Sequence, residues 1–182
     1  MRRILVASAA LAAIHAPGAL ADQMDDRLDG FFADLHSADE FDAPAIVDRI
    51  RVIWSESQSA TADLLYERVE TALALGEIET AAALADHLTG VAPSYAEGWR
   101  LKAMVLMAQE EFDAAIEPLE RVIALEPRHF DAYVALGDLF QILDNKRAAF
   151  AAYEEALKYN PHHEGAKRKA DQLRADAVGR GI

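Results

Sequence analysis

Apolar residues recur every three or four positions over most of the chain, which is the spacing of helices with one buried face. Two segments ahead of position 60 follow it, residues 25–36 and residues 44–54. Their apolar residues share one face of each helix: Leu28, Phe31, Phe32, Leu35, Ile46, Val47, Ile50, Ile53 and Trp54. Few β-branched or aromatic residues alternate with polar ones, so strands have little support. The pattern predicts an all-α protein that begins with a helical hairpin.

Three prolines, Pro93, Pro127 and Pro161, divide the middle of the chain into segments of 34 residues: 62–95, 96–129 and 130–163. Other residues keep the same spacing in pairs: Trp99 with Tyr133, and Ala115 with Ala149. A residue before proline avoids the helical conformation, so each proline ends a helix. The period predicts three consecutive copies of one structural repeat.

The third segment carries large and small residues in an ordered pattern: Tyr133, Leu136, Gly137, Phe140, Ala149, Tyr153, Ala156 and Pro161. The second segment keeps Trp99, Ala103, Phe112, Ala115 and Pro127, and the first keeps Gly76, Ala81 and Pro93. This pattern resembles the tetratricopeptide repeat (TPR) family, although Leu65 replaces an aromatic residue in the first segment. The resemblance implies a right-handed solenoid of helix pairs, in which the small residues lie where helices cross closely.

Both flanks of the repeats are predicted to cover the ends of the stack. Residues 22–61 are expected to form either a cap or a diverged fourth repeat, and Val47 and Trp54 favour the cap because both are too bulky for the small positions of a repeat. Residues 164–182 are expected to form a capping helix with a narrow apolar stripe and a solvated basic face. Within the middle repeat, Pro118 predicts a lost backbone hydrogen bond near the start of a helix.

The first 21 residues have the organisation of a secretory signal peptide. Arg2 and Arg3 precede an apolar stretch from Ile4 to Ala16, and Ala19-Leu20-Ala21 has the small residues of a cleavage site. We expect cleavage after Ala21 and a periplasmic or secreted protein, with no membrane span after cleavage. The alternative is an uncleaved anchor, and the two arginines alone do not decide the export route.

Composition narrows the partners. The chain has no cysteine, which excludes disulfides, thiolate nucleophiles and cysteine metal ligands. The formal net charge is −13, and removal of residues 1–21, which hold two arginines and no acidic residue, takes it to −15. Such acidity argues against nucleic acid and anionic membranes as partners.

No residue pattern favours catalysis or a cofactor. No serine lies in a Gly-x-Ser-x-Gly elbow and no glycine-rich phosphate loop is present. The compact group His162-His163-Glu164 follows Pro161 in a turn, where adjacent side chains rarely converge on one ion, so we interpret these residues as surface side chains. The sequence therefore predicts neither an enzyme nor a metal protein.

The family resemblance implies a concave groove that binds peptides or helices and is lined by the first helix of each repeat. Carried onto this chain, the lining is Asp63, Tyr66, Glu67, Glu70, Arg100, Leu101, Met104, Met107, Asp131, Val134, Asp138 and Gln141. Some family members clamp a terminal carboxylate with several basic residues, whereas Arg100 is the one basic residue here and the acidic residues would repel a carboxylate. An acidic groove with two adaptable methionines predicts a basic and apolar ligand, unless Met104 and Met107 belong to the core.

Two functions follow from these features. The first is a non-catalytic periplasmic scaffold that binds a protein or peptide in the groove. The alternative is a structural accessory subunit that assembles through the hydrophobic hairpin, with Phe31, Phe32 and Trp54 at the interface. The sequence leaves the oligomeric state and the partner open.

Overall fold

The computed structural model of the protein describes residues 25–178, with side chains described as far as residue 174. The predicted signal peptide lies outside this description. Every regular element between residues 25 and 178 is a helix, so the expectation of an all-α fold is confirmed. The helices are α1 (Asp26–Ser37), α2 (Ala43–Ser55), α3 (Ala60–Ala74), α4 (Ile78–Val91), α5 (Ala96–Ala108), α6 (Ile116–Leu125), α7 (Phe130–Ile142), α8 (Lys146–Tyr159) and α9 (Glu164–Val178).

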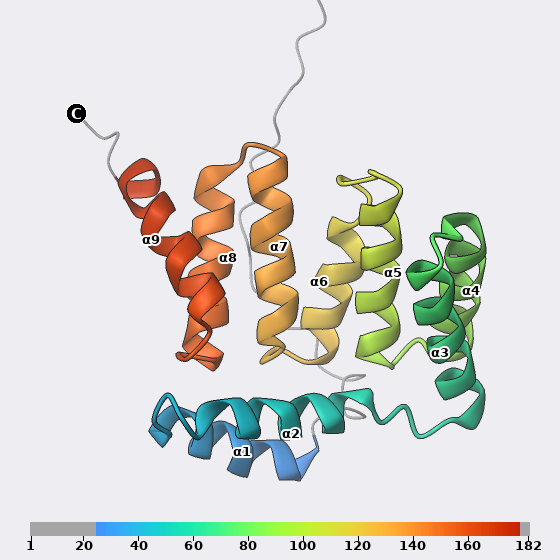
Figure 1. Ribbon diagram of the computed structural model, residues 1–182, viewed down its shortest axis with the longest axis horizontal. Coiled ribbons are helices and arrows are strands. Elements are labelled where there is room, and N and C mark those ends of the chain that lie inside the picture. The colour runs from blue at the N-terminus through green and yellow to red at the C-terminus, as the bar shows by residue number, and fades with distance from the viewer. Residues whose placement is uncertain (1–24, 179–182) are drawn as a thin grey trace, which may run out of the picture.

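Helices α3 to α8 form three consecutive pairs that stand side by side, and α9 continues the row beyond α8 (Figure 1). The turn inside each pair contains one residue with positive φ: Gly76 at 73°, Glu110 at 62° and Asp144 at 55°. In each turn the following residue donates its backbone N–H to a carbonyl five residues earlier, as in Asn145 to Phe140 at 2.7 Å. Because this arrangement satisfies the last carbonyls of a helix, the three turns end α3, α5 and α7 in the same way.

Between the pairs, α4, α6 and α8 end two residues before Pro93, Pro127 and Pro161, as the spacing predicts. Helix α6 differs from its counterparts because it begins later and has 10 residues where α4 and α8 have 14. Pro118 is the third residue of α6, a position whose N–H has no partner inside a helix. The predicted lost hydrogen bond is therefore avoided by a shorter helix instead of a kink.

The close crossing of α7 and α8 depends on Gly137. A Cβ atom at this position would lie 2.4 Å from Cε1 of Tyr153, whose side chain is fully buried. The small residues predicted for other crossings, Ala115, Ala149 and Ala156, are all buried as well. The repeat pattern therefore reflects steric limits at helix crossings.

The hairpin of α1 and α2 lies across one edge of the stack, roughly perpendicular to the repeat helices (Figure 1). It does not stack on α3 and α4 as a cap of the first repeat would. Its buried face, which includes Leu28, Phe32 and Trp54, joins one core with Phe130 of α7 and Tyr153 of α8. The expectation of a cap at the start of the solenoid is therefore wrong: the apolar face of the hairpin is matched by the third repeat.

Hydrogen bonds fix the hairpin along the turns that join one repeat to the next. Tyr95 donates its hydroxyl to the carbonyl of Ser55 at 3.0 Å, close to the end of α2. At the other end of the edge, Nε2 of His162 lies 3.1 Å from the carbonyl of Leu35 in α1. The hairpin thus spans the edge from the second repeat to α9.

Helix α9 buries Ala166, Ala170 and Leu173 against the third repeat, and its remaining described side chains face outward or sit at the edge. None of the helices between residues 25 and 178 has the length and apolar character needed to cross a bilayer.

Candidate protein-binding groove

The predicted groove residues do not all reach one open surface. Leu101 retains 1% of its side-chain exposure and packs in the core between the first two repeats, so its assignment to the groove is wrong. Met107 is half-buried against the core of the second and third repeats. Met104, on the adjacent turn of α5, is 44% exposed. A family pattern assigns residues to a face of a helix only to within about one position along the sequence. At Leu101, one position decides whether the side chain lies in the core or on the surface.

A buried polar network links the first helices of the three repeats, α3, α5 and α7, at the base of the groove. Glu97 of α5 accepts a hydrogen bond from Nε of Arg100 at 2.6 Å, and its second oxygen lies 2.8 Å from Nε2 of His129. Nη2 of Arg100 lies 3.1 Å from the hydroxyl of Tyr66 in α3. Nδ1 of His129 accepts the backbone N–H of Ala132, so His129 also caps α7. The network fixes α3, α5 and α7 relative to one another.

The charges in this network shift its pKa values in opposite directions. Burial alone would raise the pKa of Glu97, but the hydrogen bond with His129, the positive charge of Arg100 and the hydrogen bond from Arg100 outweigh it and lower the pKa to about 2. Burial and the neighbouring carboxylate of Glu97 raise the pKa of Tyr66 to about 12. Glu97 is therefore ionised and Tyr66 protonated at neutral pH. Arg100, the one basic residue of the predicted groove, is already neutralised by Glu97.

The hairpin covers the end of the groove at α7. Asp131 accepts two hydrogen bonds from the guanidinium of Arg51 in α2, at 2.8 and 2.9 Å. Val134 packs against the core that the hairpin shares with the third repeat. Both residues belong to the predicted lining, but here they bind the protein's own N-terminal hairpin.

The side chains farther along α7 contact α8 and α9. Asp138 accepts hydrogen bonds from the hydroxyl of Tyr153 and from Nζ of Lys169, both at 2.5 Å. The same hydroxyl lies 2.9 Å from Oε1 of Gln141. The positive charge of Lys169 offsets the negative charge of Asp138, so this end of the groove is less acidic than the sequence suggests.

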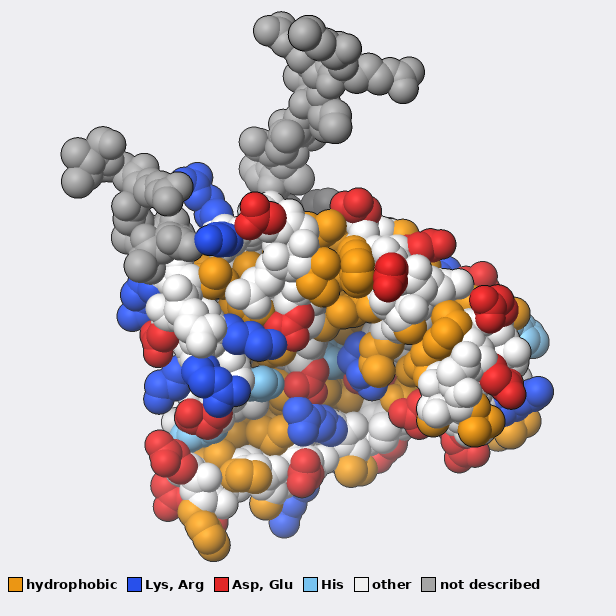
Figure 2. Space-filling view, turned by 45° about the horizontal axis from the view of Figure 1, so that its top comes forward, with side chains coloured by type: hydrophobic (Ala, Val, Ile, Leu, Met, Phe, Trp, Pro, Cys, Tyr) orange, Lys and Arg blue, Asp and Glu red, His pale blue; other side chains and the backbone are white. Residues whose placement is uncertain are grey.

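The open part of the groove lies over α3 and α5. Glu67, Glu70 and Met104 are exposed there, beside the half-buried Tyr66. Asp63 accepts a hydrogen bond from the hydroxyl of Ser57, in the linker between α2 and α3. Figure 2 shows a hollow on the surface of the molecule in which hydrophobic, acidic and basic side chains lie together. The surface over α3 and α5 combines the negative charge of Glu67 and Glu70 with an accessible thioether.

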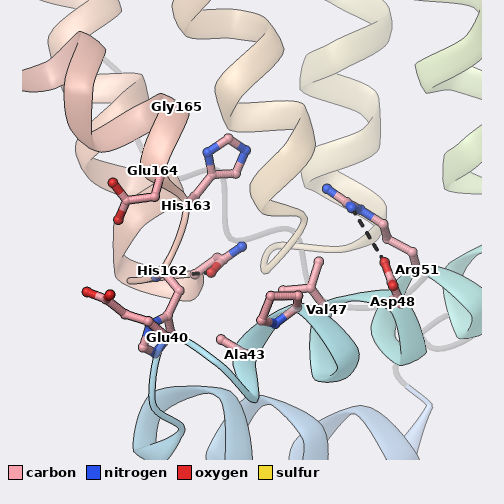
Figure 3. Close-up of a pocket in the computed structure, with 11 residues that line it drawn as sticks. Glu40, Ala43, Val47, Asp48, Arg51, His162, His163, Glu164 and Gly165 are labelled. Atoms are coloured by element: carbon pink, nitrogen blue, oxygen red, sulfur yellow. Dashed lines mark hydrogen bonds and ion pairs between the residues drawn. The ribbon is translucent and has the colours of Figure 1, made fainter.

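A separate pocket of about 450 Å³ opens where α2 meets the turn between α8 and α9 (Figure 3). Ala43, Pro44 and Val47 form an apolar side, and the carboxylates of Glu40, Asp48 and Glu164 lie around the space together with Arg51, Asn160, His162, His163 and Gly165. Among the residues whose side chains are described, no three histidine, aspartate or glutamate side chains lie in an arrangement that could hold a metal ion. His162 and His163 are half-buried, and each makes a hydrogen bond that joins or caps helices: Nε2 of His162 lies 3.1 Å from the carbonyl of Leu35, and Nδ1 of His163 accepts the backbone N–H of Ala166.

Comparison with known proteins gives the family. The tetratricopeptide repeat model matches residues 66–124 and 100–161, which together span more than half of the chain. The chain belongs to the tetratricopeptide repeat family. The match covers all three predicted repeats, so the resemblance and the expected solenoid fold are confirmed.

A TPR repeat-containing protein of Rhizobium etli is 27% identical over 154 residues, which cover 84% of this chain and 76% of that protein. Among solved structures, the Arabidopsis OM64 TPR domain has a TM-score of 0.60 at 17% identity, covering 63% of this chain and 95% of that domain. The first TPR of Spaghetti (RPAP3), bound to an HSP90 peptide, has a TM-score of 0.60 at 18% identity, with 63% and 91% covered. A MamA double mutant has a TM-score of 0.59 at 17% identity and covers 88% of both chains.

In this TPR protein the sequence missed the residues that join the hairpin to the repeats. Arg51 of α2 donates to Asp131 of α7, Tyr95 donates to the carbonyl of Ser55, and Trp54 stacks on His129. A signal was present for one of them, because His129 and His163 are 34 residues apart and occupy equivalent turns. The partners on α2 follow no such repeat.

Proposed function

We propose that this TPR protein is an exported, non-catalytic scaffold that binds a basic and apolar segment of a partner protein over α3 and α5. TPR folds serve as protein interaction modules, and the first TPR of RPAP3 is bound to an HSP90 peptide. The exposed acidic face beside Met104 carries the proposal. It is the part of the groove that neither the hairpin nor α9 occupies.

Charge selects the ligand. Glu67 and Glu70 are exposed on α3, and Glu97 neutralises the guanidinium of Arg100. A ligand with lysine or arginine gains from both exposed carboxylates, and an apolar side chain of the same ligand covers Met104, which adapts to different shapes. The peptide in the RPAP3 complex has the sequence SRMEEVD, and its acidic residues would meet like charge on this surface.

The accessory-subunit alternative loses its support from the hairpin. Trp54 and Phe32 keep 3% and 5% of their exposure, because both pack inside the chain's own core. Phe31 is half-buried beneath Arg49, whose guanidinium carbon lies 5.9 Å from the ring centroid. Phe31, Phe32 and Trp54 thus pack within one molecule, whereas Phe41, in the turn between α1 and α2, is 90% exposed.

Fluorescence anisotropy tests the proposal, with the protein lacking residues 1–21 and a labelled peptide that alternates arginine or lysine with leucine. We expect saturable binding that weakens as salt rises, because the carboxylates are exposed and screened. The acidic peptide SRMEEVD should not bind. Charge reversal by Glu67→Lys with Glu70→Lys should weaken binding of the basic peptide by roughly tenfold.

The matched control is Glu79→Lys with Glu120→Lys, which makes the same charge change at exposed positions of the second helices α4 and α6. This variant should bind like the wild type. Equal loss in both double variants would reduce the effect to net charge alone, and unchanged binding in the α3 variant would place the ligand elsewhere. Either result overturns the proposed groove.

Export rests on the N-terminal sequence. Arg2 and Arg3, the apolar stretch after them and the small residues Ala19 and Ala21 support cleavage before Asp22 and a periplasmic or secreted location. Purification of the native protein from the cell envelope or medium, followed by N-terminal sequencing, should find a chain that begins at Asp22. A chain that retains residues 1–21 would show an anchor instead.

A further inference from the structure

Two turns between repeats have the same construction but different surroundings. In one, Oε1 of Glu126 accepts the backbone N–H of Arg128 at 2.9 Å, and in the next, Oδ1 of Asn160 accepts that of His162 at 3.2 Å. His129 and His163 then cap α7 and α9 through Nδ1, at 3.2 and 3.1 Å. His129 and His163 are therefore equivalent imidazoles, one repeat apart.

The first imidazole is covered and the second is open. The indole of Trp54 stacks on the ring of His129, with 4.0 Å between centroids and 13° between planes. Seven residues earlier on α2, about 10 Å along the helix, the equivalent position is Val47. Val47 is too short to cover His163, and the pocket of about 450 Å³ lies there.

Two further differences enlarge the second site and change its charge. Phe130, which is fully buried against Trp54, is replaced one repeat later by the exposed Glu164. Asp131 is replaced by Gly165, where an added Cβ would press within 3.2 Å of the His163 ring. The pocket is thus the counterpart of a site filled by an aromatic ring, with a carboxylate in place of one aromatic wall (Figure 3).

Charge decides what fits. Glu40, Asp48 and Glu164 line the pocket. Arg51, its one lysine or arginine, is held by Asp131 through two hydrogen bonds, and its Nη1 lies 3.9 Å from Oδ1 of Asp48 (Figure 3). Glu40 and Glu164 make no such ion pair among the residues whose side chains are described. A neutral aromatic ligand would remove water from these carboxylates without giving them a hydrogen-bond donor or a positive charge in its place. A guanidinium is planar, stacks on a ring and binds carboxylates through paired N–H groups.

We propose that this pocket binds an arginine side chain of the partner protein, with its guanidinium stacked on His163 and paired with Glu164, and its methylene stem against Pro44 and Val47. The inference rests on the proposed function, because it names one side chain by which the partner is held. The pocket lies at the α9 end of the hairpin, apart from the carboxylates of α3. An arginine outside the segment bound over α3 and α5 would therefore anchor the partner a second time.

The test uses a small probe, so that it does not depend on the groove ligand. N-acetyl-arginine amide is titrated into the protein lacking residues 1–21, while NMR follows the imidazole resonances of His163 and His129. We expect a saturable shift at His163 with millimolar affinity and none at His129, which Trp54 covers. The citrulline analogue, which has the same shape without the charge, should bind at least about tenfold more weakly.

Val47→Trp should abolish the shift, because the indole would fill the pocket as Trp54 fills its counterpart. Val52→Trp is the matched control, since it adds the same ring at a position of α2 that is 59% exposed and outside the pocket. Glu164→Gln alters an exposed side chain and should weaken the probe without loss of folding. A His163 shift that survives Val47→Trp, or an equal affinity for citrulline, would overturn the proposal.

The lack of any saturable shift at His163 would overturn it as well, and so would binding of inorganic phosphate there in place of the arginine probe. None of these outcomes bears on the peptide titration at Glu67 and Glu70. If the peptide fails to bind over α3 while the arginine probe binds at His163, the proposed groove fails and the pocket stands.

Discussion

The indole of Trp54 lies parallel to the imidazole of His129, with 4.0 Å between the two ring centroids. Trp54 ends the buried face of the hairpin, and His129 caps the first helix of the third repeat. From His129, a chain of hydrogen bonds continues through Glu97 to Arg100 and Tyr66. The contact therefore connects the hairpin to the base of the groove.

Replacement of Trp54 by alanine should release the hairpin from this edge. Loss of a buried tryptophan side chain costs about 3–5 kcal/mol of unfolding free energy. Urea denaturation measures this loss, and hydrogen exchange of the backbone amides in α1 and α2 should speed up more than that of α3 and α4. Val52→Ala, on the exposed side of α2, is the control and should change stability by less than about 0.5 kcal/mol. A loss for Trp54→Ala no larger than for this control would contradict the docked hairpin.

The crossing of α7 and α8 allows a second comparison, between two glycines in helices. Gly137→Ala would place a Cβ 2.4 Å from the ring of Tyr153 and should destabilise the protein by roughly 1–3 kcal/mol. Gly30→Ala in α1 meets no atom within 4 Å and should stabilise it by about 0.5–1 kcal/mol, because alanine favours a helix. Thermal and urea unfolding of both variants check the opposite signs. Equal effects would show that helix propensity, and not the crossing, governs position 137.

The turn between α5 and α6 has a residue with an unfavourable backbone conformation. Glu110 has φ of 62°, whereas the equivalent turn of the first repeat uses Gly76. An L side chain in this region costs about 1–2 kcal/mol, of which the greater chain entropy of glycine offsets about half. Glu110→Gly should therefore raise the free energy of unfolding by up to about 1 kcal/mol, and Gly76→Ala should lower it by a similar amount. A lower stability for Glu110→Gly would mean that the side chain makes a contact worth more than the strain.

The repeats were predictable because their constraints are local and periodic. The prolines that follow α4, α6 and α8 recur at a spacing that the sequence displays, and the small residue Gly137 beneath Tyr153 belongs to the pattern of the third segment. The delayed start of α6 also follows from one visible residue, Pro118. These features need no knowledge of distant contacts.

The hairpin and the groove were less predictable because they depend on contacts between distant segments. The apolar face of α1 and α2 was visible in the sequence, but nothing local to Trp54 or Arg51 specifies His129 or Asp131 as partners. Consequently Asp131 and Val134 were assigned to an open groove that the hairpin covers. Leu101 was misplaced for a different reason, because one helical step separates it from the surface beside Arg100.

The ionisation of Glu97 predicts how stability depends on pH. Its pKa is about 2 in the folded protein, below the ordinary value of 4.5, because the interactions with His129 and Arg100 outweigh the effect of burial. A depressed carboxyl pKa contributes stability that is fully present above the unfolded pKa and is lost as pH falls from about 4.5 towards 2.

Compared with Glu97→Gln, the wild type should be more stable by on the order of 3 kcal/mol near neutral pH, and this advantage should shrink as the pH falls from about 4.5 towards 2. Urea unfolding of both proteins over the acidic range measures the difference, with Glu79→Gln as an exposed control that should show no such trend. An advantage that stays constant as the pH falls would mean that the charge of Glu97 does not stabilise the base of the groove.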